Sequence, residues 1–180
     1  MSRIVLIYGL ISGLVIIAGI IGSIVAFADA PHSNVWVGYL IMLAALSSIL
    51  VGVKQHRDQA LGGVIGFGKA FLIGLGIALV AALAYIVVWE IYLAATGYRF
   101  MDQYVAQMLE TRRAAGVSGA EYEKLAADLE AMRLQYANPL FRVPMTFLEI
   151  FPVGLLISLV SAALLRNPRF LPARARPVSA

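Results

Sequence analysis

Residues 54–71, KQHRDQALGGVIGFGKAF, form a charged stretch between two long apolar runs. The stretch contains Lys54, Arg57, Asp58 and Lys69, although only 13% of the 180 residues are charged. Each flanking run is about as long as the ~20 apolar residues that an α-helix needs to cross a membrane. Because short cytoplasmic loops of membrane proteins carry an excess of Lys and Arg, we interpret this stretch as a loop on the inner side of a membrane.

The composition supports a membrane protein and excludes several kinds of site. Hydrophobic residues make up 61% of the chain, which is more than a soluble domain of this size carries. The absence of cysteine excludes disulfides and thiol chemistry. With two histidines, His32 and His56, we expect no metal site, and no motif indicates a cofactor. The formal charge of +4 is typical of cytoplasmic edges, so we expect no nucleic-acid partner.

Four segments are long and apolar enough to be membrane spans. They cover about residues 4–28, 35–53, 67–95 and 144–165. The first ends in AFADA (26–30), which resembles a signal-peptide cleavage site. Its apolar run is much longer than the ~7–15 residues of a signal peptide, so we expect it to remain as a span.

The distribution of Lys and Arg predicts the orientation of these spans. The loop DAPHSN (29–34) has neither residue, whereas Arg3 precedes the first span. Four arginines follow the last span: Arg166, Arg169, Arg174 and Arg176. We therefore expect both termini and the 54–66 loop to face the cytoplasm, and the 29–34 loop to face outward.

The chain reads as one transmembrane domain over residues 1–166 and a basic cytoplasmic tail over residues 167–180. The tail, NPRFLPARARPVSA, is rich in Pro and Arg. We expect it to be disordered and to adhere to anionic lipid, because cations near such a surface are attracted by about 1 kcal/mol each.

A helical hairpin over about residues 100–137 is predicted between the third and fourth spans. Apolar residues recur at helical spacing over 100–114 and again over 119–137. Ser118 and Glu121 have the spacing of a capping box at the start of the second helix. Two interpretations remain open. The helices could cover each other and the end of the bundle, or rest in the headgroups; or they could form a docking surface for a periplasmic protein or a second copy.

Two acidic residues lie within the apolar segments, where ionised groups are costly and are functional candidates. Glu90 is near the outer end of the third span, and Glu149 is about one turn inside the fourth. They could face each other across a cavity, or each could pair with Arg99 or Arg142. The candidate roles are a structural ion pair, a proton or cation site, and an acid–base pair. We predict no catalytic residue, because no nucleophile or metal ligands accompany them.

The charged motif of the inner loop also has alternatives. The stem of Lys69 can follow the apolar surface and place its charge at the phosphates, or its ammonium can pair with Asp58 and lock the loop onto the bundle. Lys54 and Asp58 are four residues apart and would form a helical ion pair if the second span continues into the loop.

Small residues in the first span form one G-x-x-x-G motif at Gly9 and Gly13. Such motifs let helices approach closely. The motif therefore predicts either close packing within one chain or a dimer face.

Three short motifs carry a family resemblance. They are YGLISG (8–13), GVKQHRD (52–58) and FGKAF (67–71). In this order and spacing they resemble the bacterial membrane proteins grouped as domain of unknown function 4199. The resemblance covers about residues 4–166 and does not extend past Asn167.

The resemblance implies a four-span protein of the bacterial inner membrane and implies no reaction. With the apolar segments, it predicts an all-α membrane protein of four transmembrane helices with an extramembrane amphipathic hairpin. We expect a non-enzymatic scaffold, accessory or lipid-binding module that associates with membrane lipids and forms oligomers. The alternative is a small transporter or ion-conducting protein that uses Glu90 and Glu149, although the spans show no obvious inverted repeat.

Overall fold

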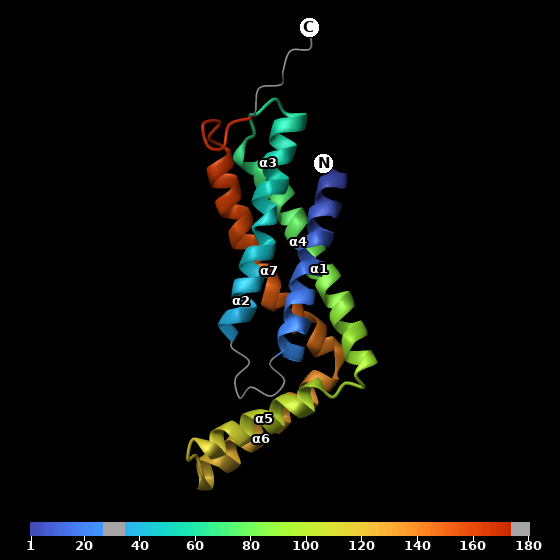
Figure 1. The fold of residues 1–180 in the computed structure, drawn as a ribbon, viewed down its shortest axis with the longest axis vertical. Coiled ribbons are helices and arrows are strands. Elements are labelled where there is room, and N and C mark those ends of the chain that lie inside the picture. The colour runs from blue at the N-terminus through green and yellow to red at the C-terminus, as the bar shows by residue number, and fades with distance from the viewer. Residues whose placement is uncertain (27–34, 174–180) are drawn as a thin grey trace.

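The computed structural model describes residues 1–26 and 35–173, and this part of the chain is all-helical. Its helices are α1 (Ser2–Ala26), α2 (Val35–Leu46), α3 (Ser48–Ala60), α4 (Phe67–Ala95), α5 (Phe100–Ala114), α6 (Gly119–Ala137) and α7 (Pro139–Leu165). Figure 1 shows α1, α2–α3, α4 and α7 running along one bundle, with α5 and α6 at the end opposite the start of α1 and the end of α7. The predicted loop 29–34 lies outside the described residues, as does the tail from residue 174.

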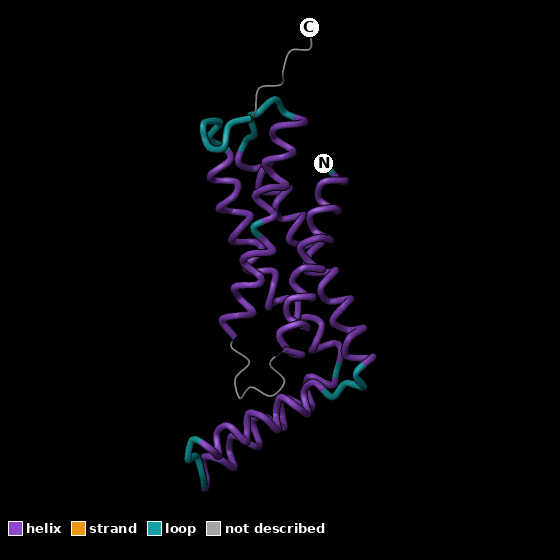
Figure 2. The backbone as a smooth tube through the Cα atoms, in the orientation of Figure 1, coloured by secondary structure: helices purple, strands orange, loops and turns teal. Residues whose placement is uncertain are grey.

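Four helical stretches are long and apolar enough to cross a membrane. They are Ser2–Ile24, Trp36–Ala60, Phe67–Ala95 and Pro139–Leu165. Figure 2 shows that the connections described between these stretches lie at the ends of the bundle. The bundle's outward surface carries large apolar side chains, including the exposed Leu10, Leu83 and Leu148. A broad apolar exterior of this kind is typical of a surface that faces lipid.

α4 is the central helix of the bundle and packs extensively against α1 and α7. The glycines of the G-x-x-x-G motif explain how closely α1 approaches it. A Cβ added at Gly9 would lie 2.5 Å from the Val80 Cβ, and one added at Gly13 would lie 2.6 Å from the Ala81 carbonyl oxygen. Both distances are shorter than real carbon contacts, so only glycine fits. Of the two predicted uses of the motif, packing within the chain is the one that the structure shows.

The second long stretch is nearly continuous, with one turn at Ser47 between α2 and α3. The Ser47 hydroxyl donates to the Leu43 carbonyl at 2.7 Å. α3 then continues to Ala60, seven residues beyond the predicted end of the second span at Val53. The charged motif predicted to lie in a loop is therefore on the last turns of α3, and the non-helical connection is 61–66.

α7 begins at Pro139, five residues before the predicted start of the fourth span at Pro144. The side-chain oxygen of Asn138 accepts a hydrogen bond from the Leu140 amide at 3.0 Å. Proline fits the first helical position, where the missing N–H has no intrahelical partner to lose. The helix also continues through Pro152, which lies inside it.

α5 and α6 occupy the residues predicted for the two helices and pack on each other (Figure 1). Met101 and Val105 of α5 and Leu129 of α6 form a small buried cluster of their own. Ser118 stands at the N-cap of α6, but its side chain makes no capping hydrogen bond. The capping box predicted for Ser118 and Glu121 is therefore not formed.

Candidate functional site

Arg142 joins three helices at the end of the bundle that carries α5 and α6. It lies in the first turn of α7 and is 3% exposed. Its Nε and Nη2 donate to the two carboxylate oxygens of Glu90 on α4, at 2.7 and 2.6 Å. Its Nη1 donates to the carbonyls of Tyr136 and Ala137, at 2.9 and 3.4 Å. Paired donation of this kind is the strongest geometry between arginine and carboxylate, so the guanidinium fixes the end of α6 to α4 and α7.

Aromatic side chains surround this ion pair. The rings of Tyr98 and Tyr136 lie 5.2 and 5.7 Å from the guanidinium carbon of Arg142, within cation–π range. The indole N–H of Trp89 donates to the Tyr136 hydroxyl at 2.9 Å. Burial raises the pKa of Tyr136, so the hydroxyl stays protonated at neutral pH. We call this group the Arg142 cluster: Trp89, Glu90, Tyr98, Tyr136 and Arg142.

The predicted pairings of the acids are resolved in part. Glu90 pairs with Arg142. Arg99 is exposed and donates to the Thr96 carbonyl at 3.2 Å, and no ion pair with either acid is present in the described part of the chain. Glu149 is exposed on α7, about 15 Å along the helix from its start. Among the described residues it has no hydrogen-bond or ion-pair partner, so it pairs with neither Arg99 nor Arg142.

Arg57 connects separate segments of the chain at the other end of the bundle. Its side chain is fully buried on α3. Its Nε donates to Asp58 Oδ1 at 2.7 Å, and the Lys54 ammonium binds the other oxygen of that carboxylate at 2.5 Å. The Lys54–Asp58 contact is the predicted helical ion pair. The two terminal nitrogens of Arg57 donate to the carbonyls of Phe170, at 2.9 Å, and Leu171.

These contacts correct the expectation that the tail is disordered from residue 167 onward. Residues 167–173 fold back against the end of α3, and the side chain of Phe170 packs on the main core. The Asn167 side chain accepts from the Arg169 amide at 3.0 Å and closes a local turn. The physical reason is the buried Arg57, because its terminal donors need acceptors and main-chain carbonyls provide them.

Lys69 takes no part in the contacts of Arg57 and Asp58. It is exposed on the first turn of α4, and no ion pair to it occurs within residues 1–26 and 35–173. Asp58 is occupied by Lys54 and Arg57, so the predicted alternative of a Lys69–Asp58 pair is not formed. The placement of the Lys69 charge at lipid phosphates stays a prediction.

The sequence interpretation missed the role of Arg57 because its partners on the tail are main-chain carbonyls, which leave no signal in the side chains. One signal did exist. Arg57 continues the spacing of the buried Ile49 and Val53 by one further turn, which places it on the buried face of the helix. Arg57 and Arg142 both donate to acceptors within the protein, so each is suited to hold separate segments of the chain together.

Comparison with known proteins gives a family. The model of a family described as protein of unknown function (DUF4199) matches residues 7–167. No curated protein and no solved structure matches the chain. The matched range contains the Arg142 cluster together with Lys54, Arg57 and Asp58, and it stops just before the carbonyls that bind Arg57. Because the match covers most of the chain, the protein belongs to the DUF4199 family of proteins of unknown function.

Proposed function

We propose that the protein is a multi-pass scaffold or accessory subunit of the bacterial inner membrane rather than an enzyme. In this proposal the four apolar stretches span the membrane, and the α5–α6 pair lies outside it as a docking surface for another protein. The observation that carries the proposal is the Arg142 cluster. It fixes the base of the α5–α6 pair to two spans, as a rigid platform requires.

The charges at the two ends support the orientation. Six cations lie at the end of the bundle where α1 begins and α7 ends: Arg3, Lys54, Arg57, Lys69, Arg166 and Arg169. Among the described residues, Asp58 is the one acid that accompanies them. The α5–α6 end has acids and bases in similar numbers. Since Lys and Arg near the spans mark the cytoplasmic side, the termini face the cytoplasm and the α5–α6 pair faces the periplasm.

The surface of the α5–α6 pair supports docking. The two helices bury a short seam between them, and α6 carries Leu134 with 60% of its surface exposed. An isolated pair of helices this short gains little stability alone. A pair held rigidly on the bundle therefore has a surface free for a second copy or a periplasmic protein.

Site-specific photocrosslinking in membranes tests this proposal. A photoreactive residue replaces Leu134 in α6 or, as the matched control, the similarly exposed Leu148 in α7 (60% and 64% exposed). We expect a discrete protein adduct from position 134 and lipid adducts from position 148. An adduct of twice the chain mass identifies a second copy. Lipid adducts alone from both positions would overturn the docking role and favour helices that rest in the headgroups.

A second candidate function depends on Glu149. An exposed carboxylate without a partner in the described structure, placed well inside an apolar helix, favours a proton or cation site and hence a small transporter. Glu90 supports this less, because Arg142 holds both of its oxygens. Proton flux into proteoliposomes, followed with a pH-sensitive dye, separates the two functions. Flux that is lost in a folded Glu149→Gln variant would replace the scaffold proposal.

A further inference from the structure

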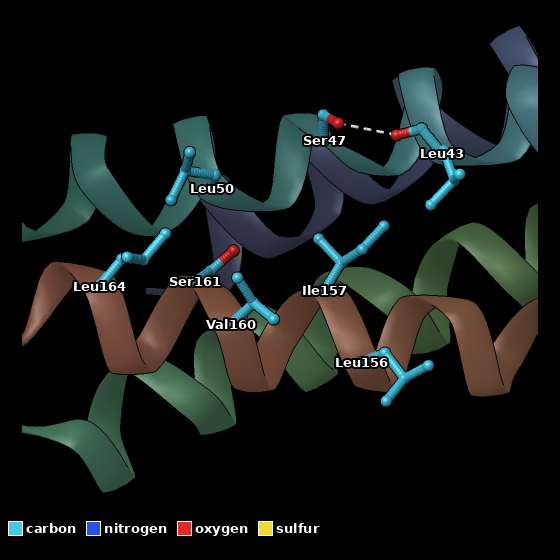
Figure 3. Close-up of a pocket in the computed structure, with 8 residues that line it drawn as sticks. All are labelled: Leu43, Ser47, Leu50, Leu156, Ile157, Val160, Ser161 and Leu164. Atoms are coloured by element: carbon cyan, nitrogen blue, oxygen red, sulfur yellow. Dashed lines mark hydrogen bonds between the residues drawn. The ribbon is translucent and has the colours of Figure 1, made fainter.

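A lateral groove of about 350 Å³ lies between α2–α3 and α7 (Figure 3). Leu43 and Leu50 form one wall, and Leu156 and Val160 form the other. The volume falls in the range of about 300–1,000 Å³ found for ligand pockets. Two of the wall residues, Leu156 and Val160, are more than half exposed, so the groove opens on the outer surface of the bundle.

One polar side chain points into this apolar groove without a partner. Ser161 is 2% exposed, and its hydroxyl makes no hydrogen bond within the described residues. Figure 3 shows the hydroxyl turned toward α3. Two other serines differ: Ser47 donates to the Leu43 carbonyl, and Ser158 donates to the Gly154 carbonyl at 2.7 Å. No fully buried side-chain polar atom of the described residues lacks a partner, so the Ser161 hydroxyl reaches the groove, where it is free to donate to an acceptor on a bound molecule.

A cation lies at the end of the groove nearest the end of α7. Leu43, Ser47 and Leu50 line the groove at helical spacing, and Lys54 is the next residue on that face. The Lys54 side chain is 30% exposed, and its ammonium, which binds Asp58 at 2.5 Å, has further N–H donors for a second acceptor. Ser161 lies about 6 Å before the end of α7. The Ser161 hydroxyl and the Lys54 ammonium are therefore both near this end of the groove.

We propose that the groove binds an anionic phospholipid of the cytoplasmic leaflet. An acyl chain lies along the leucines, Ser161 donates to an ester carbonyl at the edge of the hydrocarbon, and the Lys54 ammonium faces the phosphate. The proposal depends on the membrane location and orientation given above and is independent of the docking role of α5 and α6.

Native mass spectrometry of the full chain in mild detergent tests the groove. The probe is phosphatidylglycerol with palmitoyl and oleoyl chains, and phosphatidylcholine with the same chains is the headgroup control. The variant Val160→Trp fills the groove, whereas Val87→Trp on α4 adds the same bulk to an equally exposed position (both 57%) outside it. We expect one tightly bound phosphatidylglycerol per wild-type chain, at least tenfold weaker binding for Val160→Trp, and no change for Val87→Trp. Equal binding by the two variants would overturn the proposal.

Two further variants test the polar contacts. Ser161→Ala should weaken binding about fivefold, the equivalent of one net hydrogen bond. Lys54→Gln should remove the preference for phosphatidylglycerol over phosphatidylcholine. A wild-type chain that binds both lipids equally would overturn the role given to Lys54. If the protein is absent from isolated membranes, the proposed membrane location is wrong. If it inserts but its lipid binding does not depend on the groove, only the lipid-binding proposal is wrong.

Discussion

Each end of the bundle is held by one buried arginine, and the two differ in where their partners lie. Arg142 binds Glu90, which is 52 residues away on another helix, and the carbonyls at the end of α6. Arg57 binds its neighbour Asp58 and the carbonyls of the segment after α7. Arg142 therefore connects helices through one carboxylate, that of Glu90. Arg57 holds a chain segment, and its carboxylate partner Asp58 also binds Lys54.

This difference sets the expected cost of losing each arginine. Removing Arg142 leaves Glu90 without a cation in a largely buried site, whereas removing Arg57 leaves Asp58 still bound to Lys54. Breaking a buried pair by deleting one partner is costly because it leaves a charge uncompensated. The end that carries α5 and α6 should therefore be the more sensitive of the two.

The largest effect is expected for Arg142→Ala. The substitution should lower the free energy of unfolding by about 3–5 kcal/mol, because it leaves a carboxylate uncompensated and two carbonyls without donors. Thermal and denaturant unfolding in detergent micelles measures the change. The control is Arg99→Ala, an exposed position whose loss should change stability by less than about 0.5 kcal/mol. Similar losses from the two variants would contradict the role given to the Arg142 cluster.

A smaller effect is expected for Arg57→Ala. Loss of the charged hydrogen bonds to Phe170 and Leu171 should cost about 1.5–3 kcal/mol in total, the value of about one such bond, because the released segment is exposed and its carbonyls then bind water. It should also release the C-terminal segment, so that trypsin cleaves after Arg169 faster than in the wild-type chain. Lys69→Ala, which removes an exposed cation at the same end, is the control and should leave cleavage unchanged. A loss of stability as large as that of Arg142→Ala would remove the contrast between the two ends.

The smallest effect concerns an exposed network on the α5–α6 pair. Arg133 donates to Asp102 at 3.0 Å and to Glu130 at 2.7 Å. The hydrogen bond from Arg133 lowers the pKa of Glu130 below its ordinary value of 4.5. A carboxylate with a lowered pKa in the folded state contributes stability above its unfolded pKa and loses it as the pH falls through the folded value. The contribution is therefore complete above pH 4.5 and disappears in stronger acid.

Comparison of wild type with Glu130→Gln over pH 7 to 3 checks this sign. The wild type should have a slightly higher melting temperature at neutral pH, because exposed ion pairs contribute little. The difference should vanish in acid. A difference that grows on acidification would show that Glu130 does not act through its carboxylate charge.

The sequence predicts a structural element well where one physical effect dominates. Four apolar runs predict the long helices because unpaired main-chain groups are too costly in hydrocarbon, and helical spacing predicts α5 and α6 at the residues where they occur. The partner of Glu90 was one of three open alternatives, which were Glu149 across a cavity, Arg99 and Arg142. The contacts of Arg57 and the open hydroxyl of Ser161 depend on tertiary positions of carbonyls and helices. Local patterns do not carry that information.

In the proposed topology four helices cross the membrane and place the α5–α6 turn and the C-terminal segment on opposite sides. The chain has no cysteine, so a single introduced cysteine reports its own location without background. Ser118→Cys marks the α5–α6 turn and Ala173→Cys marks the C-terminal segment. A membrane-impermeant maleimide should label the first variant in intact spheroplasts and the second only after permeabilisation. Labelling of Ala173→Cys in intact spheroplasts, with Ser118→Cys protected, would contradict this topology.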